Sequence, residues 1–529
     1  MSSVMEDSIP AVSAEIKKAA KLVYTIGVQP LSIEQVVDIA EGHAKVALDS
    51  STSYRKRIDT GADILEQLLQ RDGLIYGVTT GYGDSCSVNV SKELAYELPK
   101  QIYTFHGCGL GEFLSETEGR AVLVTRLVSL ARGFSGVSWG LLEKIVAFIN
   151  AGIVPQIPSE GSVGASGDLT PLSYVAATLC GERDVYYKGK VIPVMDALND
   201  QGITPLKLRP KEGLALMNGT AVMTALACLN YQRADYVMQL STRITAMNLI
   251  VLDGNDYHFD ARLFAVKPHP GQSQIAQWLR EDLKTAAAPE HSSRLQDRYS
   301  LRCAPHVIGV LADSLPHYRQ FIETELNSTN DNPIIDPETR AVLHGGHFYG
   351  GHIAQAMDGL KTAVANIADL LDRQLAQAVD IKFNHGLPRN LSGASGERAV
   401  INHGLKAVQI GVSAWTAEAL KNTMPASVFS RSTECHNQDK VSMGTIAARD
   451  CRRVLEQTEQ VVAAVLFAAA QGLFLRERAG KEITSTLKET MQEVFSIMPP
   501  LFEDRALDSE LRALIKNIRM KFFTTYERV

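Results

Sequence analysis

The stretch Gly-Ser-Val-Gly-Ala-Ser-Gly-Asp-Leu-Thr-Pro-Leu-Ser, residues Gly161–Ser173, decides how the rest of this chain is interpreted. Its small residues leave the backbone free to fold back on itself, because glycine lacks a Cβ and adopts dihedral angles that other residues avoid. Asp168 and Thr170 are residue types that cap helices, and Pro171 suits a first helical turn. The stretch therefore predicts a tight loop that leads into a helix.

The tripeptide Ala165-Ser166-Gly167 in this stretch resembles the signature of the aromatic amino acid ammonia-lyases and 2,3-aminomutases. In that family the tripeptide cyclises and loses water to give 4-methylidene-imidazol-5-one (MIO), an electrophile that captures the substrate amine. The resemblance implies that MIO forms here from Ala165, Ser166 and Gly167, with no metal or nucleotide cofactor. A second copy at Ala394–Gly396 lacks the Asp-Leu-Thr-Pro context and is interpreted as an ordinary loop.

Composition and charge exclude several other classes of protein. Apolar residues make up 45% and charged residues 21% of the 529 residues, as in an ordinary globular chain. The net charge of −6, without a long basic run, argues against nucleic acid or an anionic membrane as a partner. The longest apolar run, Val461–Ala470, is too short to span a bilayer and predicts a buried helix. The seven cysteines include no Cys-x-x-Cys pair, which predicts reduced thiols in a cytoplasmic protein.

The sequence before residue 214 predicts a mixture of helices, loops and a short piece of β-structure. Residues 1–75 are predicted to be helices with polar joints, with Ser32 as a cap and helical apolar spacing over Ile58–Leu69. The glycine-rich run Tyr76–Ser87 predicts a functional loop. Asp184–Val194 predicts a short piece of β-structure. No Walker-type motif occurs, and no Gly-x-Gly-x-x-Gly follows a strand.

Long helices are predicted from Leu214 onward, at 214–250, 304–328, 350–382, 398–422 and 439–476. The predicted fold is therefore mainly α, with an N-terminal MIO-bearing active-site domain at 1–220 and a central long-helix bundle with C-terminal helices at 221–529. The resemblance covers essentially the whole chain. It implies this same architecture, that of the ammonia-lyase (fumarase/aspartase-like) superfamily, assembled as a homotetramer with shared active sites.

Three further residues match positions that the family uses in catalysis. Tyr76, in Tyr-Gly-Val-Thr-Thr-Gly-Tyr-Gly, matches the tyrosine that acts as general base, a role that requires nearby positive charge or donors to lower its pKa. Asn218, in Leu-Met-Asn-Gly-Thr, resembles the asparagine that donates to the MIO oxygen. Tyr299 would assist near the MIO. Without the family motif, a packing role would explain Tyr76 equally well. A plain Asn-Gly turn is the alternative for Asn218, but the long helical pattern that begins there makes such a turn less attractive.

The resemblance also implies residues that bind the substrate. Arg302 would hold the carboxylate with two parallel hydrogen bonds, a task that suits its fork of nitrogens, and Gln296 would position polar groups. A solvated charged loop is the alternative for the segment that holds these two residues. Asn332 would help to bind the carboxylate, Phe348 would pack on the substrate ring, and Glu434 would contact the amine.

Gln438 and the pair Phe105-His106 bear on the identity of the substrate. Histidine lyases carry a glutamate where Gln438 stands, to meet the imidazole, so Gln438 argues against histidine. At the pair, phenylalanine lyases carry Phe-Leu, tyrosine lyases His-Leu and histidine lyases Ser-His. Phe105 would supply an apolar wall, and His106 would bond a phenolic hydroxyl, which discriminates strongly against analogues without one. A satisfied core histidine is the alternative for His106.

Two positions depart from the family pattern and leave loop polarity and substrate preference open. His306 stands where the family has glutamine after proline, and His347 stands where it has asparagine. His344, His347 and His352 lie close together in the sequence. No Asp/Glu pair or Cys accompanies them at a familiar metal-binding spacing, so no metal site is predicted.

The sequence thus predicts a carbon–nitrogen lyase that eliminates ammonia from L-tyrosine to give 4-coumarate. The amine would add to the methylidene carbon derived from Ser166, and Tyr76 would take the β-proton. One alternative is a tyrosine or phenylalanine 2,3-aminomutase, which would return the ammonia at Cβ. Others are a phenylalanine ammonia-lyase that gives cinnamate, a histidine ammonia-lyase and, from a different class, a catalytically silent structural homologue. The silent homologue predicts damage at Ser166, Tyr76 or Arg302, and none is present.

Overall fold

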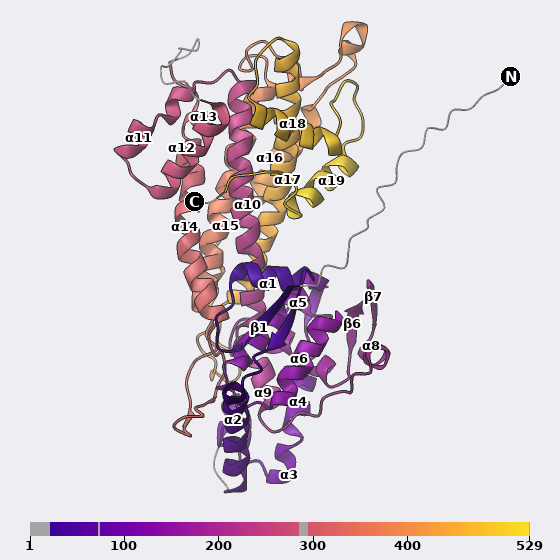
Figure 1. The fold of residues 1–529 in the computed structure, drawn as a ribbon, viewed down its shortest axis with the longest axis vertical. Coiled ribbons are helices and arrows are strands. Elements are labelled where there is room, and N and C mark those ends of the chain that lie inside the picture. Colours follow the sequence, from indigo (N-terminus) through magenta and orange to yellow (C-terminus); the bar gives the residue numbers. More distant parts are fainter. Residues whose placement is uncertain (1–21, 72–74, 285–294, 528–529) are drawn as a thin grey trace, which may run out of the picture.

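The structure, a computed structural model, describes residues 22–71, 75–284 and 295–527. Figure 1 shows an N-terminal part of short helices and small sheets below a bundle of long helices from the second half of the chain. The mainly helical fold is as predicted. The division at residue 220 stays a prediction, although α10 begins beside it, and residues 1–21 of the predicted first domain lie outside the described residues.

The N-terminal part alternates short helices with short strands. Its elements are β1 (Leu22–Ile26), α1 (Ile33–Ala40), β2 (Ala44–Leu48), α2 (Thr52–Gln70), the 3-10 helix η1 (Gly83–Ser87), α3 (Lys92–Ala95), α4 (Leu98–Phe105), β3 (Leu110–Phe113), α5 (Glu116–Ala131), α6 (Trp139–Ala151), β4 (Val154–Pro155), β5 (Pro158–Glu160), α7 (Leu169–Leu179), β6 (Asp184–Tyr187), β7 (Lys190–Pro193), α8 (Val194–Gln201) and α9 (Glu212–Met217).

The remaining elements build the bundle and its ends. They are α10 (Ala221–Val251), η2 (Asp256–Phe259), α11 (Ala261–Ala265), α12 (Pro270–Leu283), α13 (Tyr299–Arg302), α14 (Ala304–Leu326), β8 (Ile334–Ile335), β9 (Val342–Leu343), α15 (Gly351–Val379), η3 (Arg389–Leu391), η4 (Gly396–Val400), α16 (Lys406–Lys421), η5 (Ala426–Phe429), α17 (Gly444–Arg478), α18 (Ser485–Ile497) and α19 (Asp508–Arg519).

Helix α17 is the centre of the bundle. It packs along α10 and α15 and also contacts α16, α18 and α19. By length and composition it could cross a membrane, but 83% of its most apolar window is buried inside the fold. All side chains from Val461 to Ala470 are buried, so the predicted buried helix is confirmed. The contacts of α17 therefore identify it as a core helix.

The prediction of helices alone before residue 75 is wrong in part, because β1 and β2 pair in parallel on either side of α1. Five-residue strands are too short for a clear alternating pattern, and only Ile26 of β1 is buried. The other local predictions hold. Ser32 caps α1 in a capping box with Gln35, the spacing over Ile58–Leu69 belongs to α2, and β6 and β7 form the β-structure predicted over Asp184–Val194.

The long helix predicted from residue 214 is interrupted at Asn218–Thr220, between α9 and α10. The interruption has a tertiary cause. Gly219 pairs with Gly167 as an isolated parallel bridge, and the Asp168 N–H donates to the Gly219 carbonyl at 2.8 Å. This contact between residues far apart in the sequence overrides the helical pattern of the apolar residues. The helix predicted at 398–422 also begins later, at Lys406, after η4.

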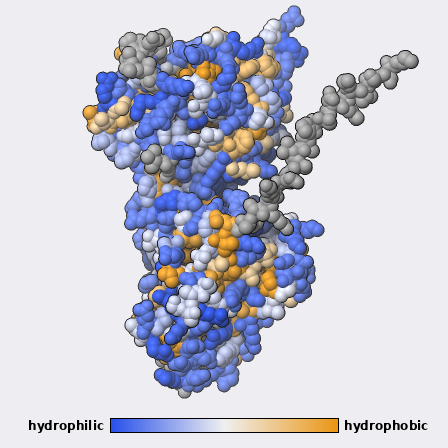
Figure 2. All heavy atoms as spheres, in the orientation of Figure 1, coloured by the Kyte–Doolittle hydropathy of each residue, from blue (hydrophilic) through white to orange (hydrophobic). Residues whose placement is uncertain are grey.

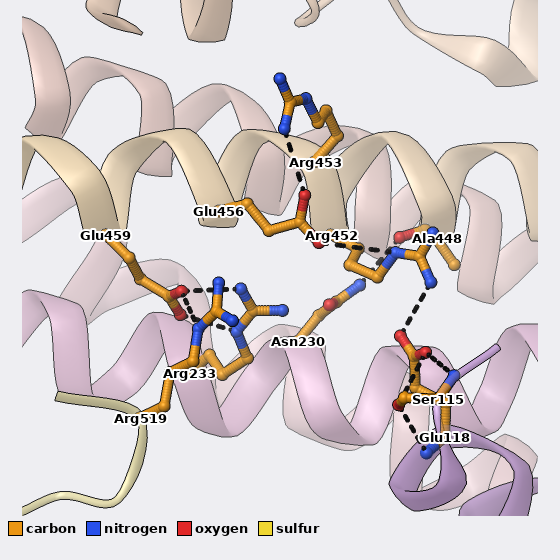
Figure 3. Close-up of polar contacts among 10 residues, drawn as sticks. All are labelled: Ser115, Glu118, Asn230, Arg233, Ala448, Arg452, Arg453, Glu456, Glu459 and Arg519. Atoms are coloured by element: carbon orange, nitrogen blue, oxygen red, sulfur yellow. Dashed lines mark hydrogen bonds and ion pairs between the residues drawn. The ribbon is translucent and has the colours of Figure 1, made fainter. Parts of the chain in front are cut away.

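Charged side chains join the N-terminal part to the bundle (Figure 3). Glu459 of α17 is only 2% exposed and accepts hydrogen bonds from Arg233 of α10, at 2.7 and 3.0 Å, and from Arg519 of α19, at 2.6 Å. Arg452 of α17 donates to Glu118 of α5 at 2.9 Å. Most of the face shown in Figure 2 is hydrophilic, and apolar side chains gather over the N-terminal part.

Candidate active site

A cavity of about 820 Å³ collects most of the residues that the sequence analysis singled out. A larger cavity of about 910 Å³ lies beside α1 and α19 and is lined by none of these residues. We therefore choose the candidate site by its lining residues and not by its volume. The predicted residues that line the smaller cavity are Tyr76, Phe105, His106, Ala165, Ser166, Asn218, Asn332, Phe348, Glu434 and Gln438.

The loop that carries Ala165-Ser166-Gly167 is shaped by close backbone approach. Gly167 has a φ of 71°, and a Cβ built there would lie 2.1 Å from the Gly219 carbonyl oxygen. Gly164 also has a φ of 71°. Cyclisation requires the Gly167 nitrogen to reach the Ala165 carbonyl carbon, and only glycine adopts such sharp turns at low cost. The residues present therefore fit the MIO group.

Asp168 anchors this loop to the two longest helices. The sequence predicts that the Asp168 side chain caps α7, but this side chain makes no capping hydrogen bond to the helix. Its carboxylate instead accepts from the N–H groups of Val222 and Met223 at the start of α10, at 3.0 and 2.9 Å, from Ser162, and from Thr445 in the first turn of α17. Burial raises the pKa of this carboxyl, although all of these donors act in the opposite direction.

Tyr76 lies in the predicted irregular loop, and its environment differs from the expected one. Its phenol oxygen accepts from the Gly83 N–H at 2.8 Å, and Glu434 holds the same loop by accepting from the Asp84 N–H at 2.8 and 3.0 Å. Burial raises the pKa of Tyr76, the Gly83 donor opposes this, and the Glu434 carboxylate adds to it. This direction is opposite to the lowered pKa expected of a general base. Among the described residues that line the cavity, Lys440 is the one lysine or arginine.

Asn218 and Asn332 meet at the floor of the cavity. Asn218 is 2% exposed, and its Nδ2 donates to the Asn332 carbonyl at 3.0 Å and to Asp331 Oδ1 at 3.3 Å. Its Oδ1 is buried and has no hydrogen-bond partner in the part of the chain that the structure describes. Asn332 in turn accepts from the Gly345 N–H at 2.9 Å. The sequence analysis missed Asp331, which directly precedes Asn332 and accepts hydrogen bonds from both Asn218 and Asn332.

His106 and Phe105 form one wall of the cavity at the end of α4, with ring centroids 4.6 Å apart. His106 Nδ1 lies 3.5 Å from Thr170 Oγ1, at the limit of a hydrogen bond, and its Nε2 makes no hydrogen bond to any residue within the described ranges. Burial lowers the pKa of His106 to about 4, so the imidazole is neutral at neutral pH. It is thus available to a polar group of a ligand.

Gln438 faces the tripeptide from the opposite loop. Its Nε2 donates to Ser166 Oγ at 3.3 Å, and its Oε1 accepts from Thr433 Oγ1 at 2.9 Å. The amide is thereby fixed with its nitrogen toward Ser166. Phe348 precedes α15 and is half-buried in the same lining. The second Ala-Ser-Gly copy lies in a loop that leads into η4, away from this cavity.

Three of the predicted site residues, Gln296, Tyr299 and Arg302, do not line this cavity within the one chain that the structure describes. The sharing of active sites between subunits that the resemblance implies stays a prediction. The three residues flank or belong to α13, where Ser300 accepts from Gln377 near the end of α15 at 2.7 Å. Phe348 stands just before the start of α15. The helical segment from Gly351 to Gln377 is about 39 Å long, at about 1.5 Å per residue. Tyr299 is 71% exposed, with the Arg302 guanidinium 4.7 Å from its ring centre.

The two departures from the family pattern fall in different places. His306 lies on α14 with its ring 5.5 Å from that of Phe264, outside the cavity. His347 is exposed beside the cavity, whereas His344 belongs to its lining. In the described ranges, no group of three His, Cys, Asp or Glu side chains is placed to hold a metal ion.

Comparison with known proteins identifies the family. The sequence matches the family described as aromatic amino acid lyase over residues 31–496. It is 35% identical to the histidine ammonia-lyase of Caldanaerobacter subterraneus over 92% of this chain and 95% of that protein. The fold is similar to the tyrosine aminomutase of Streptomyces globisporus (TM-score 0.87, 33% identity, 95% of this chain and 98% of that one). It is also similar to the phenylalanine aminomutase of Pantoea agglomerans (TM-score 0.87, 31% identity, 94% and 99%). The resemblance seen in the sequence is confirmed: the chain belongs to the aromatic amino acid lyase family.

Proposed function

We propose that this protein is a MIO-dependent ammonia-lyase that converts L-tyrosine into 4-coumarate and ammonia. The relatives are named as ammonia-lyases and aminomutases, which supports carbon–nitrogen lyase chemistry. They carry three different substrate names at 35%, 33% and 31% identity, so overall similarity does not select the substrate. The side chains of the cavity carry that argument.

The observation that carries the choice of tyrosine is the neutral His106 on the cavity wall. Its free Nε2 offers either a donor or an acceptor to a phenolic hydroxyl, depending on the tautomer. Phe105 beside it supplies apolar contact for the ring. A histidine substrate would be matched by a carboxylate at position 438, whereas this chain has the amide of Gln438, fixed toward Ser166.

The residues of the cavity divide the chemistry between them. When formed, MIO supplies an electrophile that takes the substrate amine and turns it into a better leaving group. Tyr76, as phenolate, takes the β-proton; the electrons of the C–H bond form the double bond of the acrylate, and the Cα–N bond breaks to release ammonia. Asn332 is placed to bind the substrate carboxylate, and Glu434 holds the loop of Tyr76 by accepting from Asp84.

We also propose that the site is completed in a homotetramer by Gln296, Tyr299 and Arg302 of another subunit. These residues are too far along α15 to reach the cavity of their own chain. A guanidinium from a neighbour would supply the positive charge that Tyr76 lacks. Large apolar side chains are exposed on α14, α16 and the segment after α16, as expected of surfaces that subunits cover: Val310 (57%), Ile410 (61%) and Val428 (69%).

Subunit sharing is tested by complementation. Tyr76→Phe and Arg302→Lys are each expected to abolish most of the activity of a homogeneous enzyme. Mixed oligomers of the two variants, made by co-expression, should regain activity, because some sites then receive both native side chains. If mixed oligomers form but stay as inactive as their parents, Tyr76 and Arg302 do not meet across subunits.

The substrate proposal is tested by a product assay with L-tyrosine, L-phenylalanine and L-histidine. Coumarate from tyrosine, without β-tyrosine, is the expected result. In His106→Phe the ratio of kcat/KM for tyrosine to that for phenylalanine should fall at least about tenfold, since the hydroxyl loses its partner. His306→Phe makes the same change outside the cavity and should leave the ratio unaltered. Accumulating β-amino acid would make the protein an aminomutase, and urocanate alone a histidine lyase.

MIO formation is tested by mass spectrometry of the peptide that contains Ala165, Ser166 and Gly167. Cyclisation and dehydration remove two water molecules from that peptide. Ser166→Ala, which has no hydroxyl to eliminate, should give the unmodified mass of its own peptide, keep the fold and lose turnover. Turnover that persists in Ser166→Ala would overturn the proposal.

A further inference from the structure

The short helix α13, which carries Tyr299 and Arg302, is held from two sides. It lies at the end of the bundle opposite the N-terminal part (Figure 1). On one side α15 anchors Ser300, because Gln374 Nε2 donates to its carbonyl at 2.9 Å and Gln377 Nε2 donates to its hydroxyl at 2.7 Å. Amide side chains do not titrate, so this anchor is the same at every pH.

The second anchor of α13 is the segment around η2, where His258 is the titratable member. The Asp297 N–H, two residues before α13 begins, donates to His258 Nε2 at 3.1 Å. The Asp297 carboxylate accepts from the Asn255 N–H at 2.6 Å. The side chains of His258 and Asp297 are both only 9% exposed. The contact thus fixes the start of α13 to a segment 39 positions earlier in the chain.

This contact requires a neutral imidazole. A ring nitrogen accepts a hydrogen bond only while it carries no proton, so Nε2 of His258 must be the unprotonated nitrogen. Burial lowers the pKa of His258; the Asp297 carboxylate opposes this, the Arg302 guanidinium adds to it, and the Asp256 carboxylate opposes it. Since the net direction is downward from 6.5, the ring is neutral at neutral pH.

Other charged side chains at η2 have partners of their own. Arg280 of α12, which packs on η2, donates to the Phe259 carbonyl at 2.6 Å. Arg262 of α11, which also packs on η2, pairs with Asp260 at 2.6 Å. These contacts leave His258 to the three charges named above.

Protonation of His258 would break its contact with the loop. With a hydrogen on Nε2, the ring and the Asp297 N–H would present two donors to each other. The ring would have to turn toward the Asp297 carboxylate, whose Oδ2 lies 3.6 Å from Nε2, and a second positive charge would stand near Arg302. The loop that leads into α13 would then lose the position that it has with a neutral ring.

The position of α13 decides where Arg302 points. The Arg302 guanidinium lies 4.7 Å from the ring centre of Tyr299, which is itself 71% exposed. Its Nε is buried and has no hydrogen-bond partner in the described parts of the chain. Since these contacts do not fix its direction, the guanidinium depends on the backbone of α13 for its placement.

We infer that His258 is a positioning residue for Arg302: it accepts from the Asp297 N–H and so holds α13 where Arg302 can bind the substrate carboxylate in the site of a neighbouring subunit. The inference rests on the proposed function, which gives Arg302 that role. His258 itself does not touch the substrate.

The first test is binding to the full-length Ser166→Ala enzyme, in which no turnover interferes. Calorimetry compares the Kd of L-tyrosine with that of tyramine, which lacks only the carboxylate. His258→Leu should weaken L-tyrosine at least about tenfold, the loss of one hydrogen bond to a charged group, and change the affinity for tyramine less than about twofold. His258→Gln, whose Oε1 can accept from the same N–H, should restore most of the affinity. Equal weakening of both ligands, or no rescue by glutamine, would overturn the inference.

Two reference variants separate the ways in which this test can fail. Arg302→Gln should also weaken L-tyrosine and spare tyramine. If Arg302→Gln weakens both ligands equally, the proposed role of Arg302 is wrong and the inference falls with it. If Arg302→Gln discriminates and His258→Leu does not, the inference alone is wrong.

The second reference is Asp282→Asn, which removes a buried charge from α12. Asp282 pairs with Arg243 at 2.7 Å, and both side chains are 4% exposed. Asp282→Asn should lower the melting temperature without changing the affinity for either ligand. A selective loss of L-tyrosine binding in this variant as well would assign the effect to general loosening of the fold and contradict the inference.

The second test keeps His258 in place and so does not depend on the folding of His258→Leu. Between about pH 7 and about pH 4.5 the carboxylate of L-tyrosine stays ionised. As the pH falls through this range, the Kd of L-tyrosine should rise relative to that of tyramine with His258 present, and the ratio should stay level in His258→Gln. A level ratio with His258 present, or an equal rise in both proteins, would overturn the inference. If the product assay identifies another aromatic ring, its amino acid and amine replace this pair.

Discussion

Replacing Gly167 by alanine should prevent MIO formation, and a matched glycine shows how much of the effect is backbone strain. Gly167 and Gly189 have nearly the same φ, 71° and 74°. Alanine in this left-handed region costs about 1–2 kcal/mol at either position. At Gly189, in the β6–β7 turn, nothing lies within 4 Å of an added Cβ, so backbone strain is the whole cost of the substitution.

At Gly167 the added Cβ would lie 2.1 Å from the Gly219 carbonyl oxygen. Unforced carbon–oxygen contacts need about 3.3 Å, so the two backbones must separate by roughly 1.2 Å. The hydrogen bond from the Asp168 N–H to Gly219, now 2.8 Å, would lengthen to about 4 Å and break. The loop then loses the geometry in which the Gly167 nitrogen can reach the Ala165 carbonyl.

The assay is the mass of the tripeptide-containing peptide, together with urea unfolding of the whole enzyme. Gly189→Ala should lose about 1–2 kcal/mol of stability and keep full dehydration of the peptide. Gly167→Ala should show no loss of water. Because this change also alters the cyclising residue, Gly219→Ala serves as a second variant. Its Cβ would lie 2.1 Å from Arg126 Nη1, which disturbs the same bridge from the other side. Full dehydration in both variants would refute the reasoning.

Two predictions concern ionisation. Burial raises the pKa of Tyr76, and the Glu434 carboxylate raises it further. Glu434→Gln should therefore move the alkaline rise of kcat/KM to lower pH, whereas Glu434→Asp keeps the charge and should move it less. An unmoved profile in Glu434→Gln would contradict the assignment of Tyr76 as the general base. Burial alone would raise the pKa of Glu459, but Arg233 and Arg519 outweigh it and lower that pKa in the folded protein. The stabilisation is therefore present at neutral pH and lost as the pH falls below 4.5 toward the folded pKa. Glu459→Gln should cost about 3–5 kcal/mol in urea unfolding at pH 7, with a smaller difference from the parent in acid. A difference independent of pH would argue against this account.

Local patterns in the sequence were sufficient for much of the fold. Ser32 and Gln35 sit three residues apart and form the capping box of α1, and the hairpin over Asp184–Val194 turns at a Lys-Gly pair. Such features depend on neighbours within a few residues. The break in the helix at Asn218–Thr220 does not depend on near neighbours, because it is caused by the bridge from Gly219 to the distant Gly167. The apolar pattern on both sides of the break reads as one helix.

The candidate site shows the same division. The tripeptide motif located Ser166, and family motifs located Tyr76, which the structure places in the same cavity. The anchoring of Asp168 to α10 and α17 could not be predicted, because its partners lie 54, 55 and 277 positions away. The sequence near Arg302 gave no sign that this segment lies at the far end of α15.

The anchoring of Asp168 also bears on when the proposed MIO group could form. The loop next to the tripeptide is braced only when the start of α10 and the first turn of α17 are both in place, and Thr445 emerges from the ribosome 277 residues after Asp168. On this account a growing chain would still carry an unmodified serine at position 166. A reactive electrophile on a nascent chain would be exposed to every cellular thiol and amine. If MIO forms as proposed, its formation would follow the packing of α10 and α17 against this loop, and its presence in a molecule would report that this part of the fold is complete.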